Sequence, residues 1–178
     1  SDFLAVRSSA CDEDGTQYAK AGEYDSVLNV PSNEPKAIRE AVDCVIASYQ
    51  RKGQGLGDDE VIVQEMVQNT VMSGVVFTHD LNSGAPYYVI NYDDVSGYTN
   101  TVTSGDGEYS NRTIYIHRGA IGSLRSKRFH RLLQAIVELE RVMESQFLDI
   151  EFAIGQDFTP FLLQVRAITT RPNWNRAV

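Results

Sequence analysis

Two short segments near the C-terminus, separated by a turn, constrain the fold of this chain most tightly. Residues 148–154 and 161–166 both alternate apolar and polar side chains, and a glycine-containing turn at residues 155–159 lies between them. Alternation on both sides of such a turn predicts an antiparallel β-hairpin. Successive side chains of this hairpin then point to opposite faces.

One register gives the hairpin a wholly apolar face. A shift of either strand by one residue would bring the apolar set opposite the polar set, so the sequence specifies the register well. The apolar pairs in this register are Ile150 with Val165, Phe152 with Leu163, and Ile154 with Phe161.

The polar face of the same hairpin carries two carboxylates, an amide and a guanidinium. Asp149 lies opposite Arg166, and Glu151 lies opposite Gln164. One interpretation is a cross-strand salt bridge on a solvated sheet face, which is common in antiparallel sheets. The other is a binding site in which Glu151 and Gln164 hold Mg²⁺ and Arg166 holds a phosphate, since magnesium takes one or two carboxylates plus substrate phosphates. The hairpin by itself leaves both interpretations open.

The remainder of the chain predicts an α+β fold. Helix signals cover a segment from about Pro35 to Gly53 and a second segment at residues 123–145, each with an apolar stripe on one face. Further strands are predicted at residues 3–6, 61–67, 74–78, 87–92 and 113–116. The composition predicts irregular segments or turns at residues 7–29, 68–73 and 93–111. We expect a mixed or antiparallel sheet packed by the two long helices.

The composition excludes several classes of protein. The chain has 178 residues, 42% of them hydrophobic, which suits a globular domain with one core or a core split into two lobes. A net charge of -8 argues against nucleic-acid binding, because such binding depends largely on neutralising phosphates. No apolar stretch approaches the roughly 20 residues of a transmembrane helix. The two cysteines and three histidines are widely separated, which disfavours a disulfide scaffold or a Cys/His metal site and favours a cytoplasmic location.

A series of sequence blocks runs in one order from Val6 to Thr169. The blocks are VRSSA at 6–10, ED at 13–14, AG at 21–22, SVLNV at 26–30, VQEMV at 63–67, SGVVFT at 73–78, DIEFA at 149–153 and LQVRAIT at 163–169. In content and order they resemble the phosphoenolpyruvate synthase and pyruvate phosphate dikinase family. The resemblance implies an ATP-grasp-like nucleotide-binding domain in which ATP lies between two lobes. A phosphoryl group then passes to a histidine on a separate swivelling domain, and on to pyruvate or another acceptor bound by a further domain.

The resemblance also implies roles for individual residues, with ATP and Mg²⁺ as cofactors. Arg7 would contact the ATP phosphates, and Gly22 and Ser26 would belong to the loop that covers them. The hinge strand against adenine would consist of Gln64, Glu65, Met66 and Val67, with contacts from the backbone of Glu65 and Val67.

On the hairpin, the resemblance implies a magnesium site and a catalytic pair. Glu151 and Gln164 would hold Mg²⁺, and Arg166 and Asp149 would act at the phosphoryl group that is transferred. Catalysis would then consist of positioning and charge neutralisation, with little covalent chemistry by the protein.

The chain also departs from the family pattern. Residues 91–98 replace the expected glycine-rich GLGE stretch, and Ala167 stands where the family has a proline. We expect residues 1–178 to form a single nucleotide-binding domain, a fragment of a longer ATP-dependent phosphotransferase that is inactive by itself. Two alternatives stay open: a regulatory module that binds nucleotide without turnover, and an interaction domain with no ligand.

Overall fold

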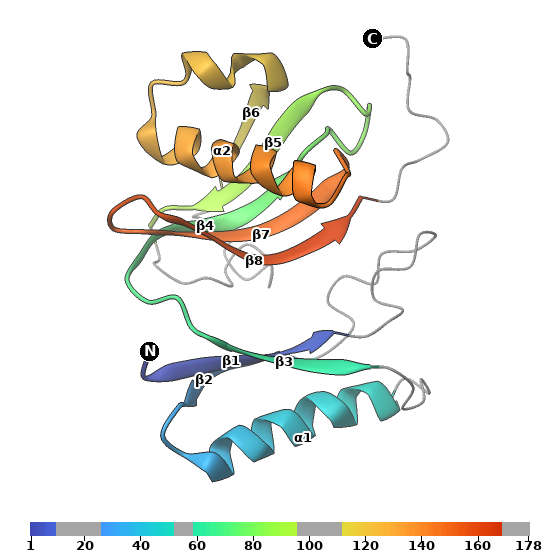
Figure 1. Ribbon diagram of the computed structural model, residues 1–178, viewed down its shortest axis with the longest axis vertical. Coiled ribbons are helices and arrows are strands. Elements are labelled where there is room, and N and C mark those ends of the chain that lie inside the picture. The colour runs from blue at the N-terminus through green and yellow to red at the C-terminus, as the bar shows by residue number, and fades with distance from the viewer. Residues whose placement is uncertain (10–25, 52–58, 96–111, 169–178) are drawn as a thin grey trace. The chain divides into compact units, whose positions relative to one another are not determined.

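The computed structural model describes residues 1–9, 26–51, 59–95 and 112–168. The chain divides into two compact units, Ser1–Gln68 and Asn69–Val178, and each is described by itself (Figure 1). The strand pairs in both units are antiparallel.

The first unit is a three-stranded sheet with one helix packed on it. Its strands are β1 (Phe3–Ser9), β2 (Val27–Pro31) and β3 (Glu60–Glu65), in the order β2-β1-β3. Helix α1 (Pro35–Arg51) lies along one face of this sheet, as Figure 1 shows. The buried core of the unit consists of Val6, Val30, Ala41, Val45 and Tyr49.

Helix α1 is fixed to the sheet by an apolar stripe and by one hydroxyl group. Val42, Val45 and Tyr49 recur at three- and four-residue steps, so they share one helix face. The Tyr49 hydroxyl donates a hydrogen bond to the Glu60 carbonyl oxygen at 2.8 Å and accepts one from the Ser9 N–H at 3.0 Å. The end of the helix is therefore bonded to both β1 and β3.

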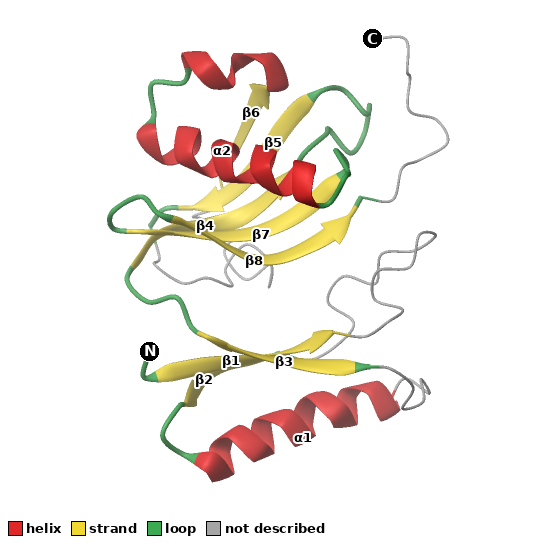
Figure 2. Ribbon diagram, in the orientation of Figure 1, coloured by secondary structure: helices red, strands yellow, loops and turns green. Residues whose placement is uncertain are grey.

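The second unit is a five-stranded sheet with one long helix packed on it. Its strand order is β6-β5-β4-β7-β8, and helix α2 lies across one face of the sheet (Figure 2). In chain order the elements are β4 (Thr70–Phe77), β5 (Tyr87–Asp93), β6 (Arg112–His117), the 3₁₀-helix η1 (Arg118–Ser123), α2 (Lys127–Val142), β7 (Leu148–Gly155) and β8 (Pro160–Ala167).

The core of the second unit lies between α2 and the sheet. Phe129, Leu132, Leu133 and Ile136 form the apolar stripe of α2, and Phe129 meets the ring of Tyr92 edge to face at 5.3 Å. The sheet contributes further fully buried side chains, which are Met72, Val76, Tyr88, Ile90, Leu148, Ile150, Phe152 and Ile154.

The expectation of one sheet packed by two long helices is not confirmed. The described residues form two sheets, and α1 with 17 residues and α2 with 16 residues each pack on a different one. The second helix also begins at Lys127 rather than at residue 123. Residues 118–123 form η1, and the extended Leu124 separates this short helix from α2.

Several strands differ from the predicted pattern. Strand β1 continues through Ser9, although residues 7–9 were predicted to be irregular, and β3 ends at Glu65 rather than at residue 67. Val27–Pro31 forms β2 through its pairing with β1, although the predicted irregular segment extends to residue 29. Strand β4 begins at Thr70, inside the turn predicted at residues 68–73. Asn69 has a φ of 54° and forms a bend directly before the strand, in a left-handed conformation that asparagine tolerates.

The predicted hairpin is formed by β7 and β8, and its predicted register is correct from Leu148 to Glu151, which includes the pair Ile150–Val165. The pairs up to Glu151 are as predicted, but a β-bulge follows, so Phe152 pairs with Leu162 instead of Leu163. Leu162 is accordingly the residue that packs against the core. A bulge leaves one residue of a strand unpaired and breaks the simple alternation. The pairs beyond it are Ala153 with Phe161 and Ile154 with Pro160.

Candidate functional site

The face of the five-stranded sheet away from α2, here termed the distal face, carries the polar hairpin residues. Its side chains alternate along each strand with those of the core. One row of the distal face, across β6, β5, β4, β7 and β8, contains Thr113, Asn91, Val75, Glu151 and Gln164. The next row contains Tyr115, Val89, Phe77, Asp149 and Arg166.

The four predicted hairpin residues lie together at the β7–β8 end of these two rows. Asp149 lies opposite Arg166 and Glu151 lies opposite Gln164, and all four are half-buried. The structure therefore brings two carboxylates, an amide and a guanidinium onto one patch, which we call the hairpin patch.

Within the hairpin patch, the amide of Gln164 contacts the guanidinium of Arg166. With the amide turned so that its oxygen faces Arg166, the oxygen accepts hydrogen bonds from Nε at 3.1 Å and Nη2 at 2.7 Å. Residues two apart on a strand share a face, which is why β8 alone can make this contact. Because the oxygen is engaged in this way, a magnesium-binding role for Gln164 requires it to turn away from Arg166.

The carboxyl of Asp149 has an unusual proton affinity. Burial raises the pKa of Asp149 to about 6; the Arg166 charge opposes this effect and the Glu151 charge adds to it. The side chain can therefore exchange a proton close to neutral pH, unlike an ordinary exposed aspartate.

The described residues at this patch do not complete the coordination of a metal ion. In the described ranges, which omit residues 10–25, 52–58, 96–111 and 169–178, no group of three or more His, Cys, Asp or Glu could hold a metal. Mg²⁺ commonly binds through one or two carboxylates together with substrate phosphates. The donors of the hairpin patch suit that mode of binding and do not form a closed metal cage.

The predicted hinge residues lie at the end of β3, in the first unit. The Met66 N–H donates to the Phe3 carbonyl oxygen at 3.0 Å, and the Met66 carbonyl oxygen accepts from the Ser1 hydroxyl at 3.2 Å. Backbone groups of successive residues on a strand point to opposite edges. The N–H and C=O of Glu65 therefore point away from β1, whereas Val67 lies beyond the end of the strand.

The other predicted residues of the first unit lie on or beside its strands. Arg7 is half-buried in β1 opposite Ile62, and Gln64 is half-buried in β3 opposite Ala5. Ser26 is exposed and directly precedes β2.

Gly22 lies outside the described residues. The hinge residues, Arg7 and Ser26 belong to the first unit, whereas the hairpin patch belongs to the second. The structure thus brings the four hairpin residues together, whereas Arg7, Ser26 and the hinge residues lie at separate places on or next to the strands of the first unit.

Two polar residues of the distal face, Asn91 and Thr113, were not among the predicted site residues. Thr113 donates a hydrogen bond through Oγ1 to Asn91 Oδ1 at 2.7 Å, and both share a row with Glu151. The signal was present in the alternation of β5, since the buried Ile90 and Tyr92 on either side place Asn91 on the distal face.

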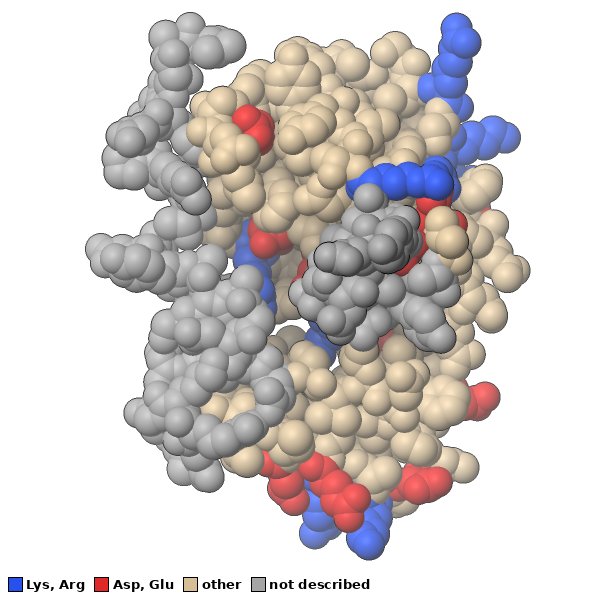
Figure 3. All heavy atoms as spheres, turned by 180° about the vertical axis from the view of Figure 1, so that it is seen from behind, with Lys and Arg blue, Asp and Glu red and all other residues tan. Residues whose placement is uncertain are grey.

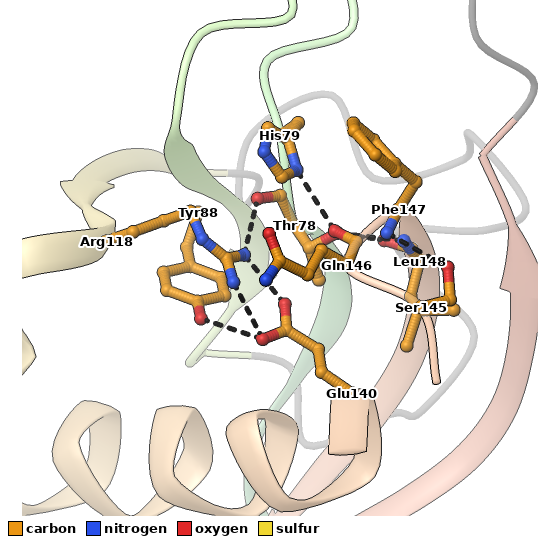
Figure 4. A network of polar contacts seen from close by, with 9 residues as sticks. All are labelled: Thr78, His79, Tyr88, Arg118, Glu140, Ser145, Gln146, Phe147 and Leu148. Atoms are coloured by element: carbon orange, nitrogen blue, oxygen red, sulfur yellow. Dashed lines mark hydrogen bonds and ion pairs between the residues drawn. The ribbon is translucent and has the colours of Figure 1, made fainter. Parts of the chain in front are cut away.

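A buried polar network surrounds Arg118 in the second unit (Figure 4). Its Nη1 and Nη2 donate to the two carboxylate oxygens of Glu140 at 2.7 and 2.8 Å, and its guanidinium lies 4.7 Å from the centre of the Tyr88 ring. The Tyr88 hydroxyl also donates to Glu140, and burial raises the pKa of Tyr88 to about 12. The network borders a pocket of about 540 Å³ and joins β5, η1 and α2.

Thr78 extends this network to the start of β7. Its backbone oxygen accepts from Arg118 Nη1 at 3.2 Å, and its hydroxyl donates to the Gln146 carbonyl oxygen at 2.6 Å and accepts from the Leu148 N–H at 2.8 Å. These bonds hold the backbone at the start of β7, directly before Asp149. Since the polar groups of the network bond to one another, we interpret it as structural.

Comparison with known families decides what kind of domain this is. Residues 1–118 match the family described as "Pyruvate phosphate dikinase, AMP/ATP-binding domain". The match includes the whole first unit and extends through β6 of the second, which is more than half of the chain. The chain belongs to this family. The resemblance seen in the sequence blocks is thereby confirmed, together with ATP as the class of ligand.

The hairpin patch of this AMP/ATP-binding domain lies outside the family match, which ends at residue 118. Its resemblance to the family rests on the sequence blocks at residues 149–153 and 163–169.

The chain is also 31% identical over 206 residues to the prodigiosin synthesizing transferase PigC of Serratia marcescens. The aligned region covers 94% of this chain and 23% of PigC, so the chain spans less than two thirds of that relative.

The described surface of this AMP/ATP-binding domain has a mixed charge. On the face drawn in Figure 3, Lys and Arg side chains lie next to Asp and Glu side chains, and much of the described surface is uncharged. Among the described residues, no helix combines the length and the apolar character needed to cross a membrane.

Proposed function

We propose that this chain is the ATP-binding part of a phosphotransferase similar to phosphoenolpyruvate synthase. The longer protein would move a phosphoryl group from Mg-ATP to a histidine on a separate swivelling domain, and then to pyruvate or another acceptor on an acceptor-binding domain. The two units would act as one nucleotide-binding domain. A cytoplasmic location, where ATP is the common phosphoryl donor, is part of the proposal.

The hairpin patch is the observation that carries this proposal. Asp149, Glu151, Gln164 and Arg166 share one half-buried patch in a chain of the AMP/ATP-binding domain family. A surface salt bridge requires only one acid and one base, whereas this patch also places a second carboxylate and an amide beside them. These donor types are the ones that bind a divalent cation and a phosphate at the same place.

In the proposed site Glu151 is the protein ligand of Mg²⁺, and Gln164 becomes a second ligand once its oxygen turns from Arg166. The donors are hard oxygens, which magnesium prefers, and substrate phosphates would complete the coordination. Bound Mg²⁺ would supply neutralisation of the phosphate charge. The protein's own part is to hold these oxygens on a rigid strand pair, so that little reorganisation is needed during the reaction.

Arg166 and Asp149 are the proposed catalytic pair. The Arg166 guanidinium is held by the Gln164 amide oxygen, so its planar donor groups are oriented before a phosphate binds. Asp149 stands opposite it with a pKa of about 6. A positive charge held in a half-buried site stabilises the negative oxygens of the transferred group more strongly than it would in open water.

In the first unit, Arg7 is proposed to contact phosphates, with Gly22 and Ser26 in the loop that covers them. The end of β3 is proposed to contact adenine through Glu65 and Val67. The orientation of the Glu65 backbone away from β1 supports this role, because the backbone groups that adenine would meet are not used by the β1–β3 ladder.

A regulatory module that binds nucleotide without turnover is the second candidate function. It is favoured by residues 91–98, which replace the expected glycine-rich stretch. The intact set of acid, amide and guanidinium groups on the hairpin patch favours the phosphotransferase.

One experiment on the intact protein separates the candidates. The thermal unfolding midpoint is measured with and without Mg-ATP, and the protein is then incubated with ATP radiolabelled at the β- and γ-phosphates. We expect a nucleotide-dependent rise in the midpoint and an acid-labile, alkali-stable label on histidine. A rise without label would indicate the regulatory module. Neither a rise nor a label would indicate an interaction domain and overturn the proposal.

A further inference from the structure

The row of the distal face that contains Glu151 also carries a hydrogen-bond donor on the other side of Val75. Asn91 in β5 and Glu151 in β7 both pair with Val75 in β4, so they are separated by two strand spacings. Neighbouring strands lie roughly 4.8 Å apart, so the two backbones are about 10 Å apart. Both side chains lie on the same face, and between them stands only the short apolar side chain of Val75.

The amide of Asn91 has a defined orientation. Its oxygen accepts the hydrogen bond from Thr113 Oγ1 at 2.7 Å, and Thr113 lies on β6, the strand farther from Glu151. Because the oxygen and nitrogen of a planar amide lie on different branches, an oxygen bonded to β6 leaves the nitrogen directed away from Thr113. Within the described residues, this nitrogen has no hydrogen-bond partner.

Strand β5 is held close to β4 at this point by a glycine. A Cβ atom on Gly74 would lie 2.1 Å from the Asn91 carbonyl oxygen and 2.8 Å from Tyr92 Cα. Only glycine permits so close an approach of two backbones. The sequence therefore fixes Asn91 near β4, with its amide oriented by Thr113 and its half-buried side chain on the face of the hairpin patch.

We infer that Asn91 is a further ligand-binding residue, whose amide N–H donates a hydrogen bond to a phosphate oxygen of the nucleotide held at Glu151. This inference rests on the proposed function and deepens it. A phosphate oxygen is an acceptor without a proton of its own at neutral pH, so it suits a donor that is neutral and already oriented. Thr113 is a positioning residue, since it acts only through Asn91. The first residue of the stretch that departs from the family pattern thereby has a role in binding phosphate.

The test compares the affinity of the intact protein for Mg-ATP and for adenosine, which has no phosphates, by calorimetry. Asn91→Ala removes the donor, and we expect it to weaken Mg-ATP binding about tenfold. Asn91→Asp keeps the shape but turns the donor into a negatively charged acceptor, so it should weaken binding more. Neither change should affect adenosine. Gln134→Ala on the exposed face of α2 is the control for loss of an amide, and it should bind both ligands as wild type does.

The Thr113 variants test the inference without changing Asn91. Thr113→Val removes the hydroxyl at nearly constant shape and should weaken Mg-ATP binding. Thr113→Ser keeps the hydroxyl and should bind Mg-ATP with the affinity of the wild type. If an Asn91 variant does not fold, this pair decides the question.

Two outcomes overturn the inference while the proposed function stands. In the first, the Asn91 and Thr113 variants bind Mg-ATP as wild type does, although Glu151→Gln weakens binding. In the second, adenosine binding falls as much as Mg-ATP binding, which shows a loss of fold or a contact with the nucleoside. If the wild-type protein itself does not bind Mg-ATP, the proposed function fails and the inference fails with it.

Discussion

Asp149 lies directly opposite Arg166 in the β7–β8 pair, and yet burial outweighs this attraction and raises the pKa of the Asp149 carboxyl to about 6. The ordinary value is 3.8. Between these two values the folded protein keeps a proton that the unfolded chain has lost. The stability that this proton provides is therefore complete below about pH 4 and is lost as the pH rises through about 6.

Replacing Asp149 with asparagine should stabilise the protein at about pH 7.5 and have little effect near pH 4. The neutral amide removes the cost of a buried charge, and the gain at the higher pH should reach at most about 2–3 kcal/mol, since one pKa unit corresponds to about 1.4 kcal/mol. Urea unfolding at both pH values measures the effect. Glu138→Gln, on the exposed face of α2, is the control. A gain of the same size at both pH values would contradict the burial explanation.

Glu151 and Arg166 should respond differently to magnesium when each is changed conservatively. Glu151→Gln keeps the shape but loses the charge, so it should raise the magnesium concentration needed for activity, and excess metal should partly restore the rate. Arg166→Lys keeps the charge but loses the planar, two-pronged geometry. It should lower turnover at every magnesium concentration. Initial rates of the intact protein across a magnesium series measure both effects.

The same two variants also test the structural alternative for the hairpin patch. If both lose only free energy of unfolding and keep wild-type turnover per folded molecule, the patch is a cross-strand salt-bridge cluster. The phosphotransfer role proposed for these residues would then be wrong.

Phe152 should contribute far more to stability than Phe161, although both belong to the same hairpin. Phe152 is fully buried in the core, whereas Phe161, which pairs with Ala153 beyond the bulge, is 40% exposed. Phe152→Ala should cost about 3–5 kcal/mol in the free energy of unfolding, and Phe161→Ala should cost clearly less because it leaves no closed cavity. Denaturant unfolding of both variants is the measurement, and equal losses would show that the bulge is misplaced.

Loss of one partner of the Arg118–Glu140 ion pair should destabilise the protein strongly, whereas replacing both partners with apolar residues should destabilise it less. The side chains of Arg118 and Glu140 are 18% and 6% exposed, and they share two hydrogen bonds. Arg118→Met or Glu140→Leu alone leaves an uncompensated charge, and each should cost about 3–5 kcal/mol. The double variant should be less destabilised than the sum of the two. Additive losses in a double-mutant cycle would mean that the pair is not coupled.

Alternation and order along the chain predict much of this structure. The pairing of residues 149–151 with residues 164–166 could be predicted, because only this register gives the hairpin one apolar face. The bulge after Glu151 could not be predicted in the same way. It depends on which of two adjacent leucines, Leu162 or Leu163, fits the core under α2, and both are equally apolar in the sequence.

The separation into two sheets was also hidden from the sequence. Both long helices show the same amphipathic period. This period predicts which helix face is buried, but it does not predict which sheet that face packs against. The pairing of Val27–Pro31 with β1 is a long-range contact, set by the register of Phe3 with Pro31 and Leu4 with Val30. Asn91 was missed for a different reason, since its importance depends on the neighbours that β4 and β6 bring to it.

The orientation of Glu65 at the end of β3 has a consequence for handling the protein. In the described part of the first unit β3 is an edge strand, and its exposed Ile62 and Val63 lie beside backbone groups that no described strand pairs with. Such an edge is a template for a strand from another molecule. Preparations without nucleotide should therefore self-associate at high concentration through this edge, and a lysine in place of Ile62 should keep them monodisperse in light scattering.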